Sequence, residues 1–168
     1  MNLANKNAPF GIRPINSGAK VIELEIIATN SVIYVGDPLK MTATGQVDLS
    51  VTAGDTIVGT SAEYKAASKG GKILVWGNPN EDFVAQMTGT ASALQTHIGN
   101  LVNHSIANGS PTTLVSGHGL DVTTVGTSSI LTFIIKGIAK DVDNIVGQYA
   151  KMVVGINKHL FNKPGAGV

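Results

Sequence analysis

Histidine is the side chain whose ordinary pKa lies closest to neutral pH, so the four histidines are the first candidates for chemistry. His97 and His104 are seven residues apart, which would place them on one face of a helix, but the Asn and Gly residues between them disfavour a helix of that length. A zinc site also needs closer ligand pairs and a third ligand. We therefore predict no metal site. We expect His118, between two glycines, to lie in a loop that is exposed or at an interface, and His159 to end a strand in a packing or hydrogen-bonding role.

Acidic side chains occur in two places at spacings that carboxylate chemistry could use. Asp141, Asp143 and Asn144 resemble the start of a calcium-binding loop, but the glycine and the distal glutamate of that loop are missing. An Asx-capped turn is the better interpretation. Glu23 and Glu25 alternate with apolar residues, so we expect them to share the solvent face of a strand, without a catalytic partner beside them.

Nucleophilic catalysis has no support in the sequence either. The chain has no cysteine, and no serine stands in a Gly-x-Ser-x-Gly motif. We therefore expect no cofactor and predict that the protein is not an enzyme. A net charge of +1, without a basic patch or interleaved aromatic residues, also gives no basis for nucleic-acid binding.

The composition is typical of short strands joined by tight turns. Charged residues make up 14% of the chain, against about 25% in ordinary soluble domains, and 20 of the 168 residues are glycine. No apolar run approaches the roughly 18 residues that a membrane helix needs. The N-terminus lacks the apolar core of a secretory signal. We expect a soluble protein that is made in the cytoplasm and has no membrane partner.

Two apolar runs near the C-terminus give the strongest strand signals. Residues 130–139 and 151–157 are rich in β-branched side chains and are predicted to be neighbours in one sheet. Residues 21–28 alternate between apolar and acidic side chains, which is the period-2 pattern of a half-buried strand. Turn signals recur about every ten residues as far as Met87. The predicted fold class is all-β with a small α content, as a compact β-barrel or β-sandwich.

The chain is predicted to consist of an N-terminal arm, one β-rich domain and a tail. Residues 1–16 are rich in Asn, Ala and Pro and should be extended, either as a strap on their own domain or as an arm that docks on a neighbouring subunit. Residues 17–160 form the β-rich domain, and residues 161–168 form the tail. Within the domain, residues 88–129 lack the regular spacing of turn signals. This segment is therefore an insertion, a second lobe or a structural part of the core, and the sequence does not decide between them.

Helical spacing occurs in this middle segment. Its apolar residues predict a short helix or a helical turn, although Thr96 and Gly99 weaken the signal. The residues that carry the spacing are Leu94, Ile98, Leu101 and Val102.

Short motifs in the first half of the chain resemble one known family. Residues 7–14 read NAPFGIRP and resemble the opening arm of a family of tailed-phage head proteins. Residues 35–38, VGDP, are similar to a turn of that family, and residues 57–59, IVG, are similar to the strand that follows it. Residues 88–129 match no pattern of the family.

The C-terminal end resembles the same family. There the family has an apolar strand, a DN turn, a short link with glycine and a last strand. These correspond to Asp143, Asn144 and Gly147 and to residues 150–159 of this chain. The sequence departs from the family pattern at Lys158, where the family has asparagine.

The resemblance implies a capsid decoration (cement) protein, a non-enzymatic subunit that binds the outer surface of an assembled phage head. Its partner would be the major capsid protein, and members of such families commonly bind as trimers near three-fold positions. The protein would be made in the host cytoplasm and then reside on the virion. The arm supplies the candidates for capsid contact, with a basic residue able to pair with a coat carboxylate. These candidates are Phe10, Ile12, Arg13 and Ile15.

Two further expectations follow from this reading. A chain truncated by residues 1–16 is expected to stay folded and to bind heads more weakly. The alternative function is a surface- or carbohydrate-binding β module of a head fibre or adhesin. That function requires an exposed aromatic platform, for which the chain holds one Trp and three Tyr.

Overall fold

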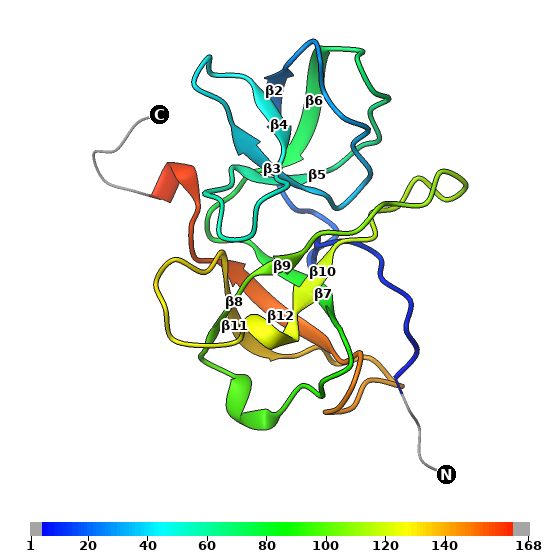
Figure 1. Cartoon of the computed structure of the whole chain (residues 1–168), viewed down its shortest axis with the longest axis vertical. Coiled ribbons are helices and arrows are strands. Elements are labelled where there is room, and N and C mark those ends of the chain that lie inside the picture. The colour runs from blue at the N-terminus through cyan, green and yellow to red at the C-terminus, as the bar shows by residue number, and fades with distance from the viewer. Residues whose placement is uncertain (1–4, 163–168) are drawn as a thin grey trace.

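The computed structural model of the chain describes residues 5–162, which form two β-rich lobes (Figure 1). The upper lobe in Figure 1 is a closed barrel of five strands, and the lower lobe contains a seven-stranded sheet. The helical segments in this range are single 3-10 turns. The all-β fold class predicted from the sequence is confirmed, and a barrel is one of the two architectures expected.

The barrel lobe has the strand order β2-β4-β3-β5-β6 and closes because β6 pairs with β2. The strand bounds are β2 (Ile22–Ile26), β3 (Pro38–Met41), β4 (Val47–Leu49), β5 (Gly59–Ser61) and β6 (Gly71–Trp76). The predicted alternation of β2 is confirmed, since Ile26 is buried whereas Glu23 and Glu25 are exposed. Branched apolar side chains fill the barrel because they fit the pleated inner face. They are Ile26, Ile33, Leu39, Val47, Val58, Ile73 and Val75.

The sheet lobe has the order β8-β11-β12-β7-β10-β9, and the short strand β1 pairs with β7. Its bounds are β1 (Arg13–Pro14), β7 (Asp82–Thr88), β8 (Leu101–Val102), β9 (His104–Ser105), β10 (Gly119–Asp121), β11 (Phe133–Ile138) and β12 (Lys151–Ile156). The two C-terminal apolar runs are β11 and β12, and they are antiparallel neighbours as predicted. Met152 and Val154 of β12 are buried, whereas Lys151 and Val153 on the opposite face are half-buried.

The middle segment, residues 88–129, is a structural part of the sheet lobe. It supplies β8, β9 and β10, and its Val102 and Leu120 are fully buried in the core. The predicted helix is reduced to one 3-10 turn, η1 (Gln95–His97). Gly99 follows this turn with a φ of +89°, which a continuing helix does not permit. A second 3-10 turn, η2 (Val122–Thr124), follows β10.

The N-terminal segment is a strap on its own chain, which is the first of the two alternatives. The strap (residues 5–15) runs along the sheet lobe, and Figure 1 shows it in blue beside β7. Ile15 N donates to Asp82 O at 2.9 Å, and Ile12 is fully buried in the core of the sheet lobe. Removing residues 1–16 would empty this core position, so the expectation that such a truncation leaves the fold intact is corrected. At the other end, η3 (Leu160–Asn162) completes the described part of the predicted tail.

Substituting Ile12 tests whether the strap belongs to the core. Ile12→Ala should lower the free energy of unfolding by about 2–5 kcal/mol, because it removes buried methyl groups and leaves a cavity. Ile15→Ala is the matched control, and should change stability by about 0.5 kcal/mol or less because this side chain is 53% exposed. Urea denaturation measures both. Equal effects of the two substitutions would contradict the burial of Ile12.

Candidate functional site

Asn144 organises the loop between β11 and β12. The side-chain amide of Asn144 donates to Ala139 O at 2.8 Å, just before this tip loop (residues 140–149), and to Lys151 O at 2.7 Å, just after it. Its Oδ1 accepts from Lys151 N at 2.8 Å. One side chain therefore satisfies backbone groups at both ends of the loop, which holds the loop in one conformation. The sequence predicted a turn with Asx caps here; the structure shows instead that Asn144 bonds to backbone groups on either side of the loop and that Asp141 pairs with Lys151.

The strap holds the tip loop from outside through Asn5. The Asn5 amide donates to Ile145 O at 2.8 Å and to Gln148 O at 2.9 Å, and Ile145 N donates to Asn5 Oδ1 at 3.0 Å. The buried side chain of Gln86 on β7 adds a second link, because it bonds both Lys6 O and Tyr149 O. Strap, tip loop and sheet thus form one hydrogen-bonded unit.

This ordered tip loop exposes branched apolar side chains. Val142 is 98% exposed, Ile145 is 46% exposed and Val146 is 42% exposed. Exposing such side chains to water is unfavourable, whereas burying them in a complex recovers roughly 25 cal/mol per Å² of apolar surface. Clustered apolar side chains on a fixed loop are typical of an interaction surface.

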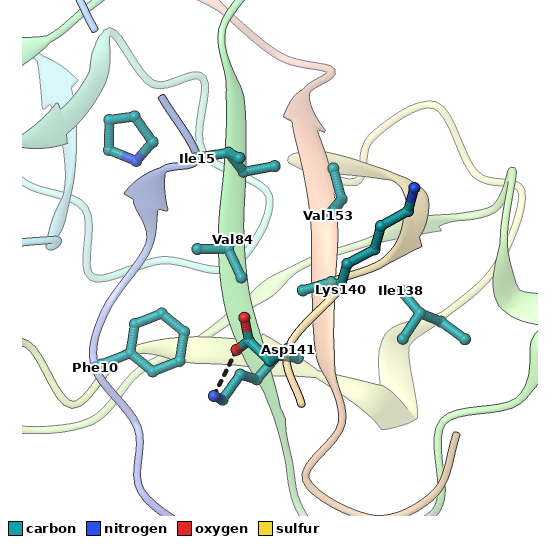
Figure 2. Close-up of a pocket in the computed structure, with 10 residues that line it drawn as sticks. Phe10, Ile15, Val84, Ile138, Lys140, Asp141 and Val153 are labelled. Carbon is teal, nitrogen blue, oxygen red and sulfur yellow. Dashed lines mark hydrogen bonds and ion pairs between the residues drawn. The ribbon is translucent and has the colours of Figure 1, made fainter. Parts of the chain in front are cut away.

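A groove lies beside the tip loop, between the strap and the outer face of the sheet. Its volume is about 590 Å³. Phe10 and Ile15 of the strap form one side, and Val84 of β7 and Val153 of β12 lie beside them (Figure 2). These β residues reach the outer face because alternate side chains of a strand point to opposite faces. Pro14 and Ile138 complete the apolar lining.

Charged groups stand at one end of this groove. Lys151 Nζ lies 2.6 Å from Asp141 Oδ2, the pair joined by the dashed line in Figure 2. The same ammonium lies 5.9 Å from the centroid of the Phe10 ring, within the range of a cation–π contact. Lys140 also lines the groove, so the groove is bordered by charged groups of both signs. The groove combines an apolar lining with a polar end, which suits an apolar segment of a partner that carries a charge at a fixed position.

The predicted capsid contacts separate into two groups. Phe10 and Ile15 line the groove and remain candidates. Ile12 is removed from the set, because its side chain is fully buried in the chain's own core and presents no surface to a partner. Arg13 lies in β1, half-buried and outside the groove lining, and burial lowers its pKa. The local pattern of the strap could not distinguish Ile12 from Ile15, since both are isoleucines in an irregular segment.

A second feature, a buried polar cluster, lies where the two lobes meet. The His104 and His118 rings stack with centroids 5.6 Å apart, and His118 Nε2 lies 3.9 Å from Asp37 Oδ1. His104 Nε2 lies 3.5 Å from Ser50 Oγ. The prediction that His118 is exposed or at an interface is wrong, since this residue is 2% exposed. Its neighbouring glycines allow close packing: a Cβ on Gly117 would lie 2.1 Å from Asn108 O.

Burial determines the charge state of this cluster. Desolvation raises the pKa of Asp37 to about 6. Desolvation and the neighbouring His104 lower the pKa of His118 to about 4, and burial also lowers the pKa of His104. At neutral pH the carboxyl is therefore ionised while both imidazoles are neutral, so the contact between His118 and Asp37 is not an ion pair.

The other two histidines lie away from this cluster. His159 is buried beside Phe161, with a pKa lowered by burial, in agreement with the packing role predicted for it. His97 lies in η1, where its Nδ1 accepts from Leu94 N at 3.3 Å. Within residues 5–162, no three His, Asp or Glu side chains come together in a way that could hold a metal ion. No helix in the same described range has the length and apolar character needed to span a bilayer.

Comparisons of the chain with protein-family models, with curated proteins and with solved structures find no match.

Asn144→Ala tests whether this side chain orders the tip loop. The substitution leaves Ala139 O and Lys151 N without their partner, while Lys151 O keeps its bond from Ala139 N, so the free energy of unfolding should fall by about 1–3 kcal/mol. Amide hydrogen exchange within residues 140–149 should accelerate while exchange in the barrel lobe stays unchanged. Asn80→Ala, at an exposed turn position, is the control and should change neither quantity. Unchanged exchange in the Asn144→Ala variant would refute this role.

Asp37→Asn tests the buried carboxyl through the pH dependence of stability. Because the folded-state pKa of Asp37 is raised from 3.8 to about 6, its stabilising contribution is present below pH 3.8 and is lost as pH rises through 6. His118 acts in the opposite sense: its lowered pKa gives a contribution that is present above pH 6.5 and lost as pH falls through 4. The substitution removes only the Asp37 contribution.

The stability of the Asp37→Asn variant relative to the unsubstituted chain should therefore rise between pH 4 and pH 8, by about 2 kcal/mol. Urea denaturation at a series of pH values measures this difference. Asp48→Asn, which neutralises a half-buried carboxyl on β4, controls for the loss of one negative charge. A difference between the Asp37→Asn variant and the unsubstituted chain that does not depend on pH would show that Asp37 titrates normally.

Proposed function

We propose that this chain is a structural virion protein that binds the outer surface of a tailed-phage head and stabilises contacts between major capsid subunits. It acts as a decoration (cement) protein, made in the host cytoplasm and bound to the shell as a trimer, and it carries out no catalysis. The tip loop, the strap and the groove between them form the docking surface.

One observation carries this proposal: the sequence segments that resemble the phage family meet in space. The N-terminal and C-terminal motifs lie beside each other, since the Phe10 ring centroid is 5.9 Å from Lys151 Nζ. Asn5 and Ile145, which lie just outside the two motifs and are 140 positions apart, exchange hydrogen bonds. The strap also contacts the VGDP turn, through the 2.9 Å bond from Ile12 N to Gly36 O. This last contact lies in the interior, where Gly36, Asp37 and Pro38 are buried, so the N-terminal and C-terminal motifs are the ones that reach the docking surface.

The physical properties of the surface suit a cement protein. Its loop is held in place before binding, so little conformational entropy is lost when a partner binds. The exposed apolar side chains and the groove offer modest contact areas to a partner, and a shell repeats each contact many times. Repeated modest contacts give large cumulative stabilisation through avidity.

A carbohydrate-binding module is the alternative, and the tyrosines bear on it. Tyr34 and Tyr64 lie with ring centroids 5.7 Å apart, but their planes are inclined at 55°. The Tyr34 ring is also covered on one side, since a Cβ on Gly109 would lie 2.3 Å from it. Two inclined rings, one of them covered, do not form the flat platform on which a sugar stacks. This geometry favours the decoration function.

Val142→Lys tests the docking surface on undecorated expanded heads. Placing a charge on the exposed tip loop should weaken co-sedimentation with heads by about 30-fold or more if Val142 is an energetic centre of the contact. The matched control is Val21→Lys, at a 46% exposed position beside the barrel, which should bind like the unsubstituted chain. Both variants should retain their thermal stability, because neither valine is buried.

A second variant, Ile15→Lys, tests the groove, because it places a charge on the side of the groove that the strap forms. Normal head binding by both the Val142→Lys and the Ile15→Lys variants would refute this docking surface. Failure of the unsubstituted chain to bind heads would refute the decoration function, and saturable binding to a glycan array would then favour the alternative.

A further inference from the structure

The strap, the tip loop and the groove between them carry more positive than negative charge. Their basic residues outnumber their acidic ones, four to two. The basic residues are Lys6, Arg13, Lys140 and Lys151, and the acidic residues are Asp141 and Asp143. Opposite charges on the two sides of an interface favour the correct partner and its orientation. The excess of positive charge therefore favours a partner surface that carries carboxylates.

Two valines that face each other across neighbouring strands form the floor of the groove. Val84 of β7 and Val153 of β12 are register partners, and both are half-buried on the outer face of the sheet. The strap forms one wall of the groove, and Ile138 and Ala139 belong to the opposite wall (Figure 2). An apolar side chain of a partner that entered the groove would therefore pack on this floor and lose contact with water.

An ion pair that is already complete borders each end of this floor. At one end Lys151 pairs with Asp141. At the other end Lys136 crosses over Gly155 to pair with Asp82, since a Cβ on Gly155 would lie 2.8 Å from Lys136 Cε. Lys151 and Gly155 are four residues apart on β12, which is about 13 Å of strand. An extended partner segment of about four residues spans this length, with alternate side chains facing the floor.

Lys140 supplies an unmatched charge beside this floor. Its side chain is exposed, lines the groove and points away from Asp141 in Figure 2. Among residues 5–162, no acidic side chain lies within ion-pair distance of the Lys140 ammonium. Because the ion pairs at the two ends are each neutral, Lys140 determines the sign of the charge that a partner in the groove should carry.

We propose that the groove binds an extended segment of the coat subunit, in which an apolar side chain covers Val84 and Val153 and an acidic side chain pairs with Lys140. The inference rests on the decoration function and specifies the partner chemistry of its docking surface. A basic segment is disfavoured, because it would meet the excess positive charge of this surface. The carboxylate belongs to a side chain and not to a chain end, because Lys140 follows Ile138 and Ala139 on the side wall, whereas the ends of the groove hold the two complete ion pairs.

Substitutions at Lys140 test the sign of this charge through the affinity for undecorated expanded heads. Lys140→Glu should weaken binding at least tenfold at low salt, because repulsion replaces attraction. Lys140→Met keeps an apolar stem and loses only the charge, so it should weaken binding about threefold. The control is Lys69→Glu, which reverses an exposed lysine of the barrel lobe and should bind like the unsubstituted chain. Raising the salt concentration should reduce the difference between Lys140→Glu and the unsubstituted chain.

Carbodiimide cross-linking of decorated heads identifies the group that meets Lys140. The reagent activates a carboxylate, the Lys140 amine attacks it, and an amide bond forms while the reagent leaves as its urea. Mass spectrometry should recover Lys140 joined to an Asp or Glu side chain within an apolar stretch of the coat subunit.

Three results would overturn this inference and leave the decoration function standing. They are full head binding by Lys140→Glu, a Lys140 cross-link only to the C-terminal carboxylate of the coat subunit, and no cross-link from Lys140 to the coat subunit on heads that have bound the chain. Failure of the unsubstituted chain to bind heads would instead overturn the decoration function and this inference together.

Discussion

The arrangement of the two lobes depends on one constraint, the close approach of two backbone segments. These segments meet at Gly11 of the strap and Gly36 of the barrel. A Cβ on Gly11 would lie 2.8 Å from Ser116 Cβ and 2.9 Å from Gly36 Cα, and both glycines have positive φ values. Only glycine combines that conformation with that space. The contact allows Ile12 N to reach Gly36 O, which ties the barrel to the residue that fills the core of the sheet lobe.

The turn that contains Gly36 also explains why a carboxyl is buried at the junction. Val35 accepts from Ser116 N at 3.0 Å, and Gly36 N donates to Ser61 O at 2.8 Å, so the turn is held from both lobes. Asp37 follows directly and therefore enters the interior between the lobes, opposite His118. The cluster is a consequence of this packing, and desolvation there disfavours the ionised carboxyl.

The same strap that joins the lobes also shapes the proposed docking surface. Ile12 faces inward and anchors the strap, which leaves Phe10 on one side of it and Ile15 on the other to line the groove. Asn5 then reaches the tip loop and fixes its position. Anchoring and docking therefore depend on neighbouring residues of one short segment, which is why a truncation of that segment would confuse loss of stability with loss of binding.

Local pattern was sufficient to predict several of the strands. The alternation in β2 and the two branched runs of β11 and β12 depend on residue type and spacing, so these strands could be predicted from the sequence. The bonds of Asn144 to residues 139 and 151 depend on how the loop folds back, so they could not. The tertiary structure alone decided that Ile12 is buried, that His118 meets Asp37 and that the strap and the tip loop lie together. Each of these contacts joins residues that are distant in sequence. Burial depends on what packs against a residue, and the local periodicity of the sequence does not contain that information.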